Sequence, residues 1–150
     1  MPHFHAEDQK AIYAERFQKA LSTTNKKLFT WVGARREDGL TSQQFFILKQ
    51  IADEERMTSS LLAERVEVKP SAITVMIERL VQNGFVERYY DPSDKRLTLL
   101  RLSKQGVLTL ENVWKQFLDI ITQLLAVMEE SEIEPFIQSF ERISEKASTV

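Results

Sequence analysis

The sequence contains no cysteine, which excludes disulfides, thiolate metal sites, cysteine nucleophiles and redox sensing through a thiol. Only four glycines and four prolines occur among 150 residues, so long loops are not expected. No apolar run approaches the ~20 residues that span a bilayer, and the N-terminus lacks the apolar core of a signal peptide. We therefore expect a cytoplasmic protein without a membrane partner, folded as a single domain over residues 1–150.

The sequence also lacks an overall excess of basic residues, since the formal net charge is −2. The charge is unevenly distributed, however: residues 58–104 carry eight Lys/Arg against six Asp/Glu, whereas residues 105–150 carry three against eight. This balance disfavours indiscriminate nucleic-acid binding but allows a local binding face in the middle of the chain.

Helical patterns dominate what is present. Apolar residues recur at helical spacing over the first 33 residues, and a second helix is predicted after Thr41, which forms a capping-box pattern with Gln44. Thr58 is placed to cap a short helix that ends near Arg65. Pro70 suits the first turn of the next helix, which should stop at Asn83–Gly84. Two short helices joined by a tight connector are a helix-turn-helix candidate.

A β-hairpin is predicted directly after this pair of helices. Two β-like runs, residues 85–90 and 97–102, flank a turn in which Asp91 can accept a backbone hydrogen bond and Pro92 fixes φ. Ser103 can then cap a long helix that reaches Met128, and a last amphipathic helix begins near residues 131–135. The predicted fold is mainly α with a small β-hairpin wing: a winged helix-turn-helix flanked by N- and C-terminal helices.

The segments "LTSQQFFILKQI" and "LLAERVEVKPSAITVMIERLVQNGFVERYYDPSDKRLTLLRLSKQG" resemble the multiple-antibiotic-resistance regulator (MarR) family. The family's wing pattern is Asp-x-Arg, five residues, then Leu-Thr. Here Asp94-Lys95-Arg96 is followed after five residues by Leu102-Ser103. The resemblance implies a winged helix over about 41–103 and a homodimer that interlocks through about 1–33 and 104–150. The surplus apolar surface of these terminal helices also favours a second copy over a self-contained bundle.

The predicted function is that of a dimeric transcription factor, a repressor, which reads a pseudo-palindromic operator in double-stranded DNA. Arg96 on the hairpin tip can enter the minor groove while Asp94 orients its guanidinium; the alternative is an ordinary solvated turn. Arg79 and Arg88 can either reach the DNA backbone or tie the helix to the wing. The full set of predicted DNA contacts is Lys69, Ser71, Thr74, Val75, Arg79, Arg88, Asp94, Lys95 and Arg96.

Regulation by a small aromatic or phenolic ligand is a further implication of the resemblance. Aromatic residues lie on the helices where such a pocket is expected, although aromatics at helical spacing are also ordinary core. The predicted pocket residues are Tyr13, Phe17, Trp31, Phe45 and Trp114, with Arg35 and Arg36 able to attract an anionic effector.

No catalytic constellation or glycine-rich phosphate loop occurs, so neither an enzyme nor a cofactor is predicted. His3 and His5 stand near Glu7 and Asp8, but two histidines at a chain end are not expected to bind a metal. The alternative function is a winged-helix module that binds another protein and does not bind DNA.

Overall fold

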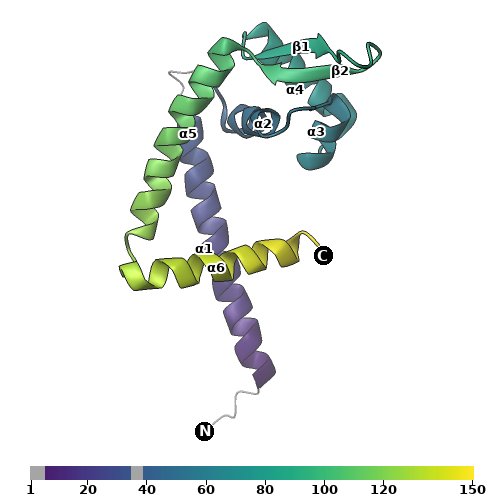
Figure 1. Ribbon diagram of the computed structural model, residues 1–150. Coiled ribbons are helices and arrows are strands. Elements are labelled where there is room, and N and C mark those ends of the chain that lie inside the picture. Colours follow the sequence, from purple (N-terminus) through teal and green to yellow (C-terminus); the bar gives the residue numbers. More distant parts are fainter. Residues whose placement is uncertain (1–5, 35–38) are drawn as a thin grey trace. The chain divides into compact units, whose positions relative to one another are not determined.

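The structure is a computed structural model that describes residues 6–34 and 39–150. Within these two ranges, six helices and one hairpin follow in the predicted order (Figure 1). They are α1 (Ala6–Ala34), α2 (Ser42–Ala52), α3 (Ser59–Arg65), α4 (Pro70–Gln82), β1 (Val86–Tyr90), β2 (Thr98–Leu102), α5 (Lys104–Leu125) and α6 (Glu130–Ala147). The predicted fold class is confirmed. The helix predicted to reach Met128 ends at Leu125, and the last helix, predicted to begin near residues 131–135, begins at Glu130.

The chain forms two compact units, the first ending at Leu110 and the second running from Glu111 to Val150. The boundary falls inside α5, whose first turns belong to the unit that contains the hairpin. The single domain expected over residues 1–150 remains a prediction.

The core of the first unit is formed by apolar side chains from α2, α3, α4 and the hairpin. Within it, α3 packs on α4, while α2 contacts both α3 and β2. Ile73, Ile77 and Leu80 of α4 are buried, and Met76 is half-buried. The core side chains that are almost completely buried include Phe45, Ile47, Leu48, Met57, Leu62, Leu99 and Leu100.

The helix ends follow the local signals of the sequence. The Thr41 hydroxyl accepts a hydrogen bond from the Gln44 amide (3.2 Å), and the Gln44 side chain accepts one from the Thr41 amide (3.0 Å). Thr58 caps α3 by accepting from the Leu61 amide (3.1 Å). Pro70 opens α4, and Gly84 with φ of 79° follows its end. The predicted caps and the stop are therefore confirmed, and they fix the lengths of the two helices in the helix-turn-helix.

The hairpin is antiparallel, with a register that runs from Val86 opposite Leu102 to Tyr90 opposite Thr98. A third segment joins it: Met57, just before α3, forms a bridge with Leu100, whose amide donates to the Met57 carbonyl (2.8 Å). The connection between α2 and α3 is thereby tied to the base of the hairpin.

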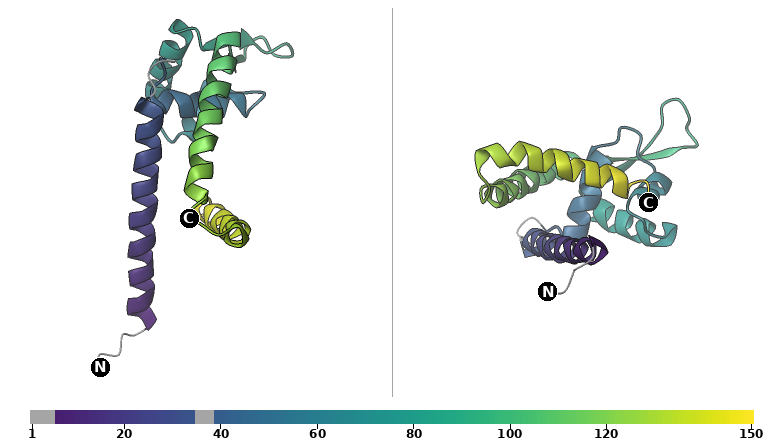
Figure 2. Two further views of the ribbon diagram at one scale, coloured as in Figure 1. Left: turned by 90° about the vertical axis from the view of Figure 1, so that its left-hand side faces the viewer. Right: turned by 90° about the horizontal axis from the view of Figure 1, so that it is seen from below.

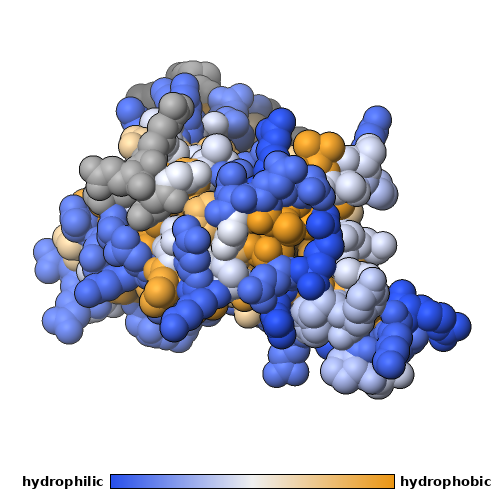
Figure 3. All heavy atoms as spheres, turned by 90° about the horizontal axis from the view of Figure 1, so that it is seen from above, coloured by the Kyte–Doolittle hydropathy of each residue, from blue (hydrophilic) through white to orange (hydrophobic). Residues whose placement is uncertain are grey.

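Several helices expose apolar side chains. Figure 2 shows α1 extending away from the other elements of the first unit, and its Ile12, Tyr13 and Phe17 are 37–58% exposed. In the second unit, α6 has no buried residue, and Phe136, Phe140 and Ile143 are 38–46% exposed. On the face in Figure 3, apolar side chains are framed by hydrophilic ones. Within the described residues, none of the helices has the length and apolarity to cross a membrane.

Candidate nucleic-acid interface

The outward face of α4 carries the small polar and apolar side chains that the sequence predicted. Ser71, Thr74 and Val75 are exposed, Val75 to 53%, and Lys69 is exposed at the N-cap position. The Thr74 hydroxyl donates to the Pro70 carbonyl (2.9 Å), which leaves its oxygen lone pairs on the exposed face. The face therefore presents hydroxyls, a methyl-bearing side chain and one cation.

An ion pair connects the C-terminal half of α4 to the hairpin. Glu78, on the same exposed face, pairs with Arg88 of β1 at 3.0 Å. Of the two roles predicted for Arg88, the structure places it as a tie between helix and wing. Arg79 is exposed and lines a cavity beside α2.

The tip of the hairpin is built around the carboxylate of Asp91, which is 1% exposed. Its Oδ1 accepts hydrogen bonds from the Ser93 amide (2.7 Å), the Ser93 hydroxyl (2.6 Å) and the Asp94 amide (3.2 Å). The hydrogen bonds from Ser93 lower the pKa of Asp91 to about 2, so the group is ionised at neutral pH. The predicted acceptor role of Asp91 is confirmed, and it sets the backbone of the turn.

The carboxylate of Asp94 binds both the backbone amide and the guanidinium of Arg96, the arginine at the tip. The Asp94 Oδ1 accepts from the Arg96 amide and from Arg96 Nε, both at 3.1 Å, and Oδ2 accepts from a terminal nitrogen at 3.4 Å. These hydrogen bonds lower the pKa of Asp94. The Arg96 side chain is nevertheless 92% exposed, and its neighbour Lys95 is exposed as well. The hairpin thus presents an oriented but solvent-accessible guanidinium.

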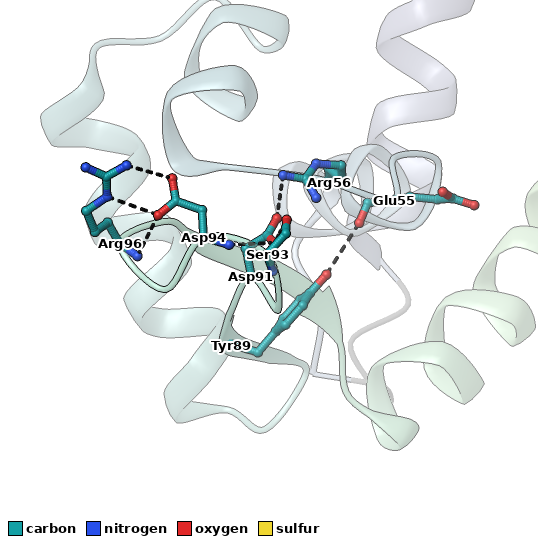
Figure 4. A network of polar contacts seen from close by, with 7 residues as sticks. All are labelled: Glu55, Arg56, Tyr89, Asp91, Ser93, Asp94 and Arg96. Carbon is teal, nitrogen blue, oxygen red and sulfur yellow. Dashed lines mark hydrogen bonds and ion pairs between the residues drawn. The ribbon is translucent and has the colours of Figure 1, made fainter.

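The hairpin has two supporting contacts that the sequence did not indicate. The Arg56 guanidinium pairs with Asp91 Oδ2, and the Tyr89 hydroxyl donates to the Glu55 carbonyl (3.4 Å). Figure 4 shows both contacts, which join the end of β1 to neighbouring residues of one segment. Both reach the segment between α2 and α3, which lies far from the hairpin in sequence. Neither contact has a local sequence signal, because its two partners are far apart in the chain.

The first turn of α5 closes the winged helix behind the hairpin. The Ser103 hydroxyl accepts from the Gly106 amide (2.9 Å) and donates to the Gly84 carbonyl (2.5 Å). The predicted cap is therefore confirmed, with serine in the place where the resembled family has threonine. A Cβ at Gly106 would lie 2.1 Å from the Phe85 carbonyl oxygen, so helix and hairpin approach here as only glycine allows.

The predicted pocket residues have different environments. Tyr13 and Phe17 are 58% and 42% exposed on α1, and Trp31 is half-buried near its end. Phe45 is completely buried in the core, so its side chain offers no surface to a ligand in this structure. Trp114 belongs to the second unit, where it stacks on Phe117 with 5.6 Å between ring centroids. A pocket made by this set remains a prediction.

A cavity of about 290 Å³ does occur in the first unit, but none of those five aromatic residues lines it. Its walls come from the end of α1, the start of α2 and the exposed side of α4. They are Phe29, Thr41, Ser42, Gln43, Gln44, Ile47, Met76 and Arg79.

The remaining sequence candidates lie outside the residues that the structure describes. These are His3 and His5, considered for a metal, and Arg35 and Arg36, considered for an anionic effector. Within residues 6–34 and 39–150, no group of three or more His, Cys, Asp or Glu side chains could hold a metal ion.

Known proteins share both the sequence pattern and the fold. A model of the MarR family matches residues 40–98. The HTH-type transcriptional repressor MdtR of Bacillus subtilis is 33% identical over 97 residues, a match that covers 65% of this chain but only 63% of MdtR. The crystal structure of YusO from the same species has a TM-score of 0.65 at 25% identity and covers 97% of this chain and 99% of YusO. Streptococcus pneumoniae FabT, solved in complex with DNA, shares the fold with a TM-score of 0.79 at 16% identity, over 91% of this chain and 98% of FabT.

Proposed function

We infer that the chain belongs to the MarR family of winged helix-turn-helix regulators, and from this premise we propose that it is a sequence-specific DNA-binding repressor of transcription. The observation that carries the proposal is the hairpin tip, where Asp94 holds the 92% exposed side chain of Arg96 in a fixed orientation. A protein that had lost DNA binding would have no need for an oriented, unshielded cation at this position. Relatives such as the repressor MdtR support the same reading.

The proposed complex places α4 in the major groove and the hairpin tip in the minor groove. Ser71, Thr74 and Val75 then face base edges and phosphates, and Lys69 contacts the backbone. Arg96 enters the minor groove, where the negative potential is strongest in A·T-rich segments. The ion pair of Glu78 with Arg88 holds the carboxylate of Glu78 away from phosphate and keeps helix and wing in register.

The proposed functional form is a homodimer that reads a pseudo-palindrome. Support comes from the apolar side chains that α1, α5 and α6 expose, because each unit leaves them in contact with water. Two recognition helices related by a two-fold axis would enter successive major grooves about 34 Å apart. Sedimentation at micromolar concentration should therefore give twice the chain mass of 17.5 kDa, and a stable 17.5 kDa species would refute the dimer.

The proposed regulation is release of DNA when a small aromatic ligand binds. A ligand shifts the equilibrium between the DNA-binding form and the released form only by its differential affinity for the two forms. The factor by which the ligand lowers operator affinity must therefore equal the factor by which the operator lowers ligand affinity. Salicylate-like and phenolic compounds, titrated while operator binding and tryptophan fluorescence are followed together, test this point. No change in either signal at millimolar concentration would end the aromatic-effector proposal, while leaving DNA binding intact.

The second candidate function is a cytoplasmic winged-helix module that binds another protein, which the net negative charge favours. Selection of bound sequences from a random DNA pool separates the two candidates. The proposed function predicts enrichment of a pseudo-palindrome, retained in a mobility-shift assay with excess competitor DNA. Recovery of unenriched sequence after repeated rounds would support the protein-binding alternative. Neither candidate involves an enzymatic activity.

A further inference from the structure

The segment between α2 and α3 contributes one charged side chain to the wing. Arg56 directly precedes Met57, which is bridged to the hairpin at Leu100. Its guanidinium pairs with Oδ2 of Asp91, and the two ends of this pair differ in environment. The Arg56 side chain is 57% exposed, whereas the Asp91 side chain is completely buried.

The other oxygen of the same carboxylate organises the hairpin tip. Oδ1 accepts from Ser93 twice and from the amide of Asp94, and Asp94 in turn accepts three hydrogen bonds from Arg96. Figure 4 shows the resulting chain of contacts, from Arg56 through Asp91 and Asp94 to Arg96. Arg56 is thus connected to the exposed guanidinium at the tip without touching it.

Because the Asp91 carboxylate is buried, loss of the Arg56 guanidinium should disturb the hairpin tip. An exposed ion pair contributes little, but removing one partner of a buried charge leaves the other uncompensated. Without Arg56, the carboxylate gains by turning toward water, and any such movement withdraws the acceptor that holds the Ser93 and Asp94 amides. Ser93 satisfies Oδ1 alone and cannot replace the cation at Oδ2.

We propose that Arg56 is a positioning residue for DNA binding, which acts through Asp91 to fix the hairpin tip that presents Arg96. The inference rests on the proposed function, because its consequence is measured as DNA affinity. It assigns a role in wing presentation to a residue outside both the recognition helix and the wing.

The test is a double-mutant cycle in the full chain, with the duplex that the wild-type protein selects from a random DNA pool as the probe. Arg56→Gln should weaken binding by roughly 2- to 150-fold, the range expected for coupling between groups in one network of hydrogen bonds and ion pairs. In an Arg96→Ala background, the same substitution should change affinity less than twofold, because there is no longer an arginine to present. Arg56→Lys keeps the charge and should restore part of the lost affinity.

Arg65→Gln is the matched control. Arg65 makes an ion pair of 2.5 Å with Glu54, and within the residues that the structure describes it has no hydrogen bond or ion pair with the wing. Its expected effect on affinity is below twofold in both backgrounds. Circular dichroism and thermal melting establish the folded fraction of each variant, and if Arg56→Gln does not fold, the cycle is run with Arg56→Lys.

Three results would overturn the inference. An equal loss in both backgrounds would mean that Arg56 contacts DNA directly or only supports the fold. No loss in the wild-type background would mean that the tip does not depend on it. Failure to select any duplex would remove the proposed function and the inference together, whereas the first two results leave DNA binding standing.

Discussion

Replacement of Gly106 by alanine tests the close approach between α5 and the hairpin. The added Cβ would lie 2.1 Å from the Phe85 carbonyl oxygen and 3.0 Å from its carbon, so helix and strand must separate by roughly 1 Å to reach ordinary contact. That separation strains two hydrogen bonds, from the Ser103 amide to the Phe85 carbonyl (2.9 Å) and from the Ser103 hydroxyl to the Gly84 carbonyl.

The magnitude follows from three contributions. Overpacking costs about 1–3 kcal/mol, and each weakened hydrogen bond costs about 1 kcal/mol. Alanine returns about 1 kcal/mol through its higher helix propensity. The net expectation is a loss of about 2–4 kcal/mol in the free energy of unfolding, which lowers the melting temperature by roughly 5–15 °C for a chain of this size.

The assay is denaturant and thermal unfolding followed by circular dichroism, at one fixed protein concentration because association affects stability. Lys104→Ala is the control: Lys104 is exposed in the same turn and its replacement should change stability by less than about 0.5 kcal/mol. If Gly106→Ala is as stable as the wild type, the close packing of α5 against Phe85 is wrong.

Two further predictions concern the wing and the helix-turn-helix. Asp91 has a lowered pKa in the folded protein, about 2 against 3.8, so its contribution to stability is complete above pH 3.8 and is lost as the pH falls toward 2. Asp91→Asn should therefore flatten the pH dependence of stability between about pH 4 and 2, as measured by urea unfolding across that range; an unchanged slope would contradict the hydrogen bonds from Ser93. Thr58→Ala removes the acceptor for the Leu61 amide and should destabilise the protein by about 1 kcal/mol, whereas Thr58→Ser should be close to neutral, in the same unfolding assay.

Features encoded within a few residues of one another were predictable from the sequence. The Thr41–Gln44 capping box, Pro70 at the start of α4 and Gly84 after its end all depend on local backbone chemistry. The pairing of Asp94 with Arg96 is equally local, since a two-residue separation in a turn brings the groups together. These signals were sufficient to predict the order of the elements and the presented arginine.

Contacts between distant segments were not predictable in the same way. The ion pair of Arg56 with Asp91 depends on a single bridge, Met57 to Leu100, which is too short to leave a periodic pattern in the sequence. The contact of Gly106 with Phe85 likewise has no local signature. Phe45 illustrates the opposite limit: an aromatic at helical spacing fits a pocket or a core equally well, and only the packing placed it in the core.

The measurement that bears most directly on DNA recognition by the wing is the affinity of Arg96→Ala for the selected duplex, by fluorescence anisotropy at physiological salt. We expect a loss of roughly 1–3 kcal/mol in binding free energy, which weakens affinity about 5- to 150-fold. The variant should also lose preference for A·T pairs at the positions that flank the major-groove contacts. Arg96→Lys, which keeps the charge but not the planar fork held by Asp94, should recover only part of this affinity. Unchanged affinity of Arg96→Ala would show that the tip does not enter DNA and would contradict the account.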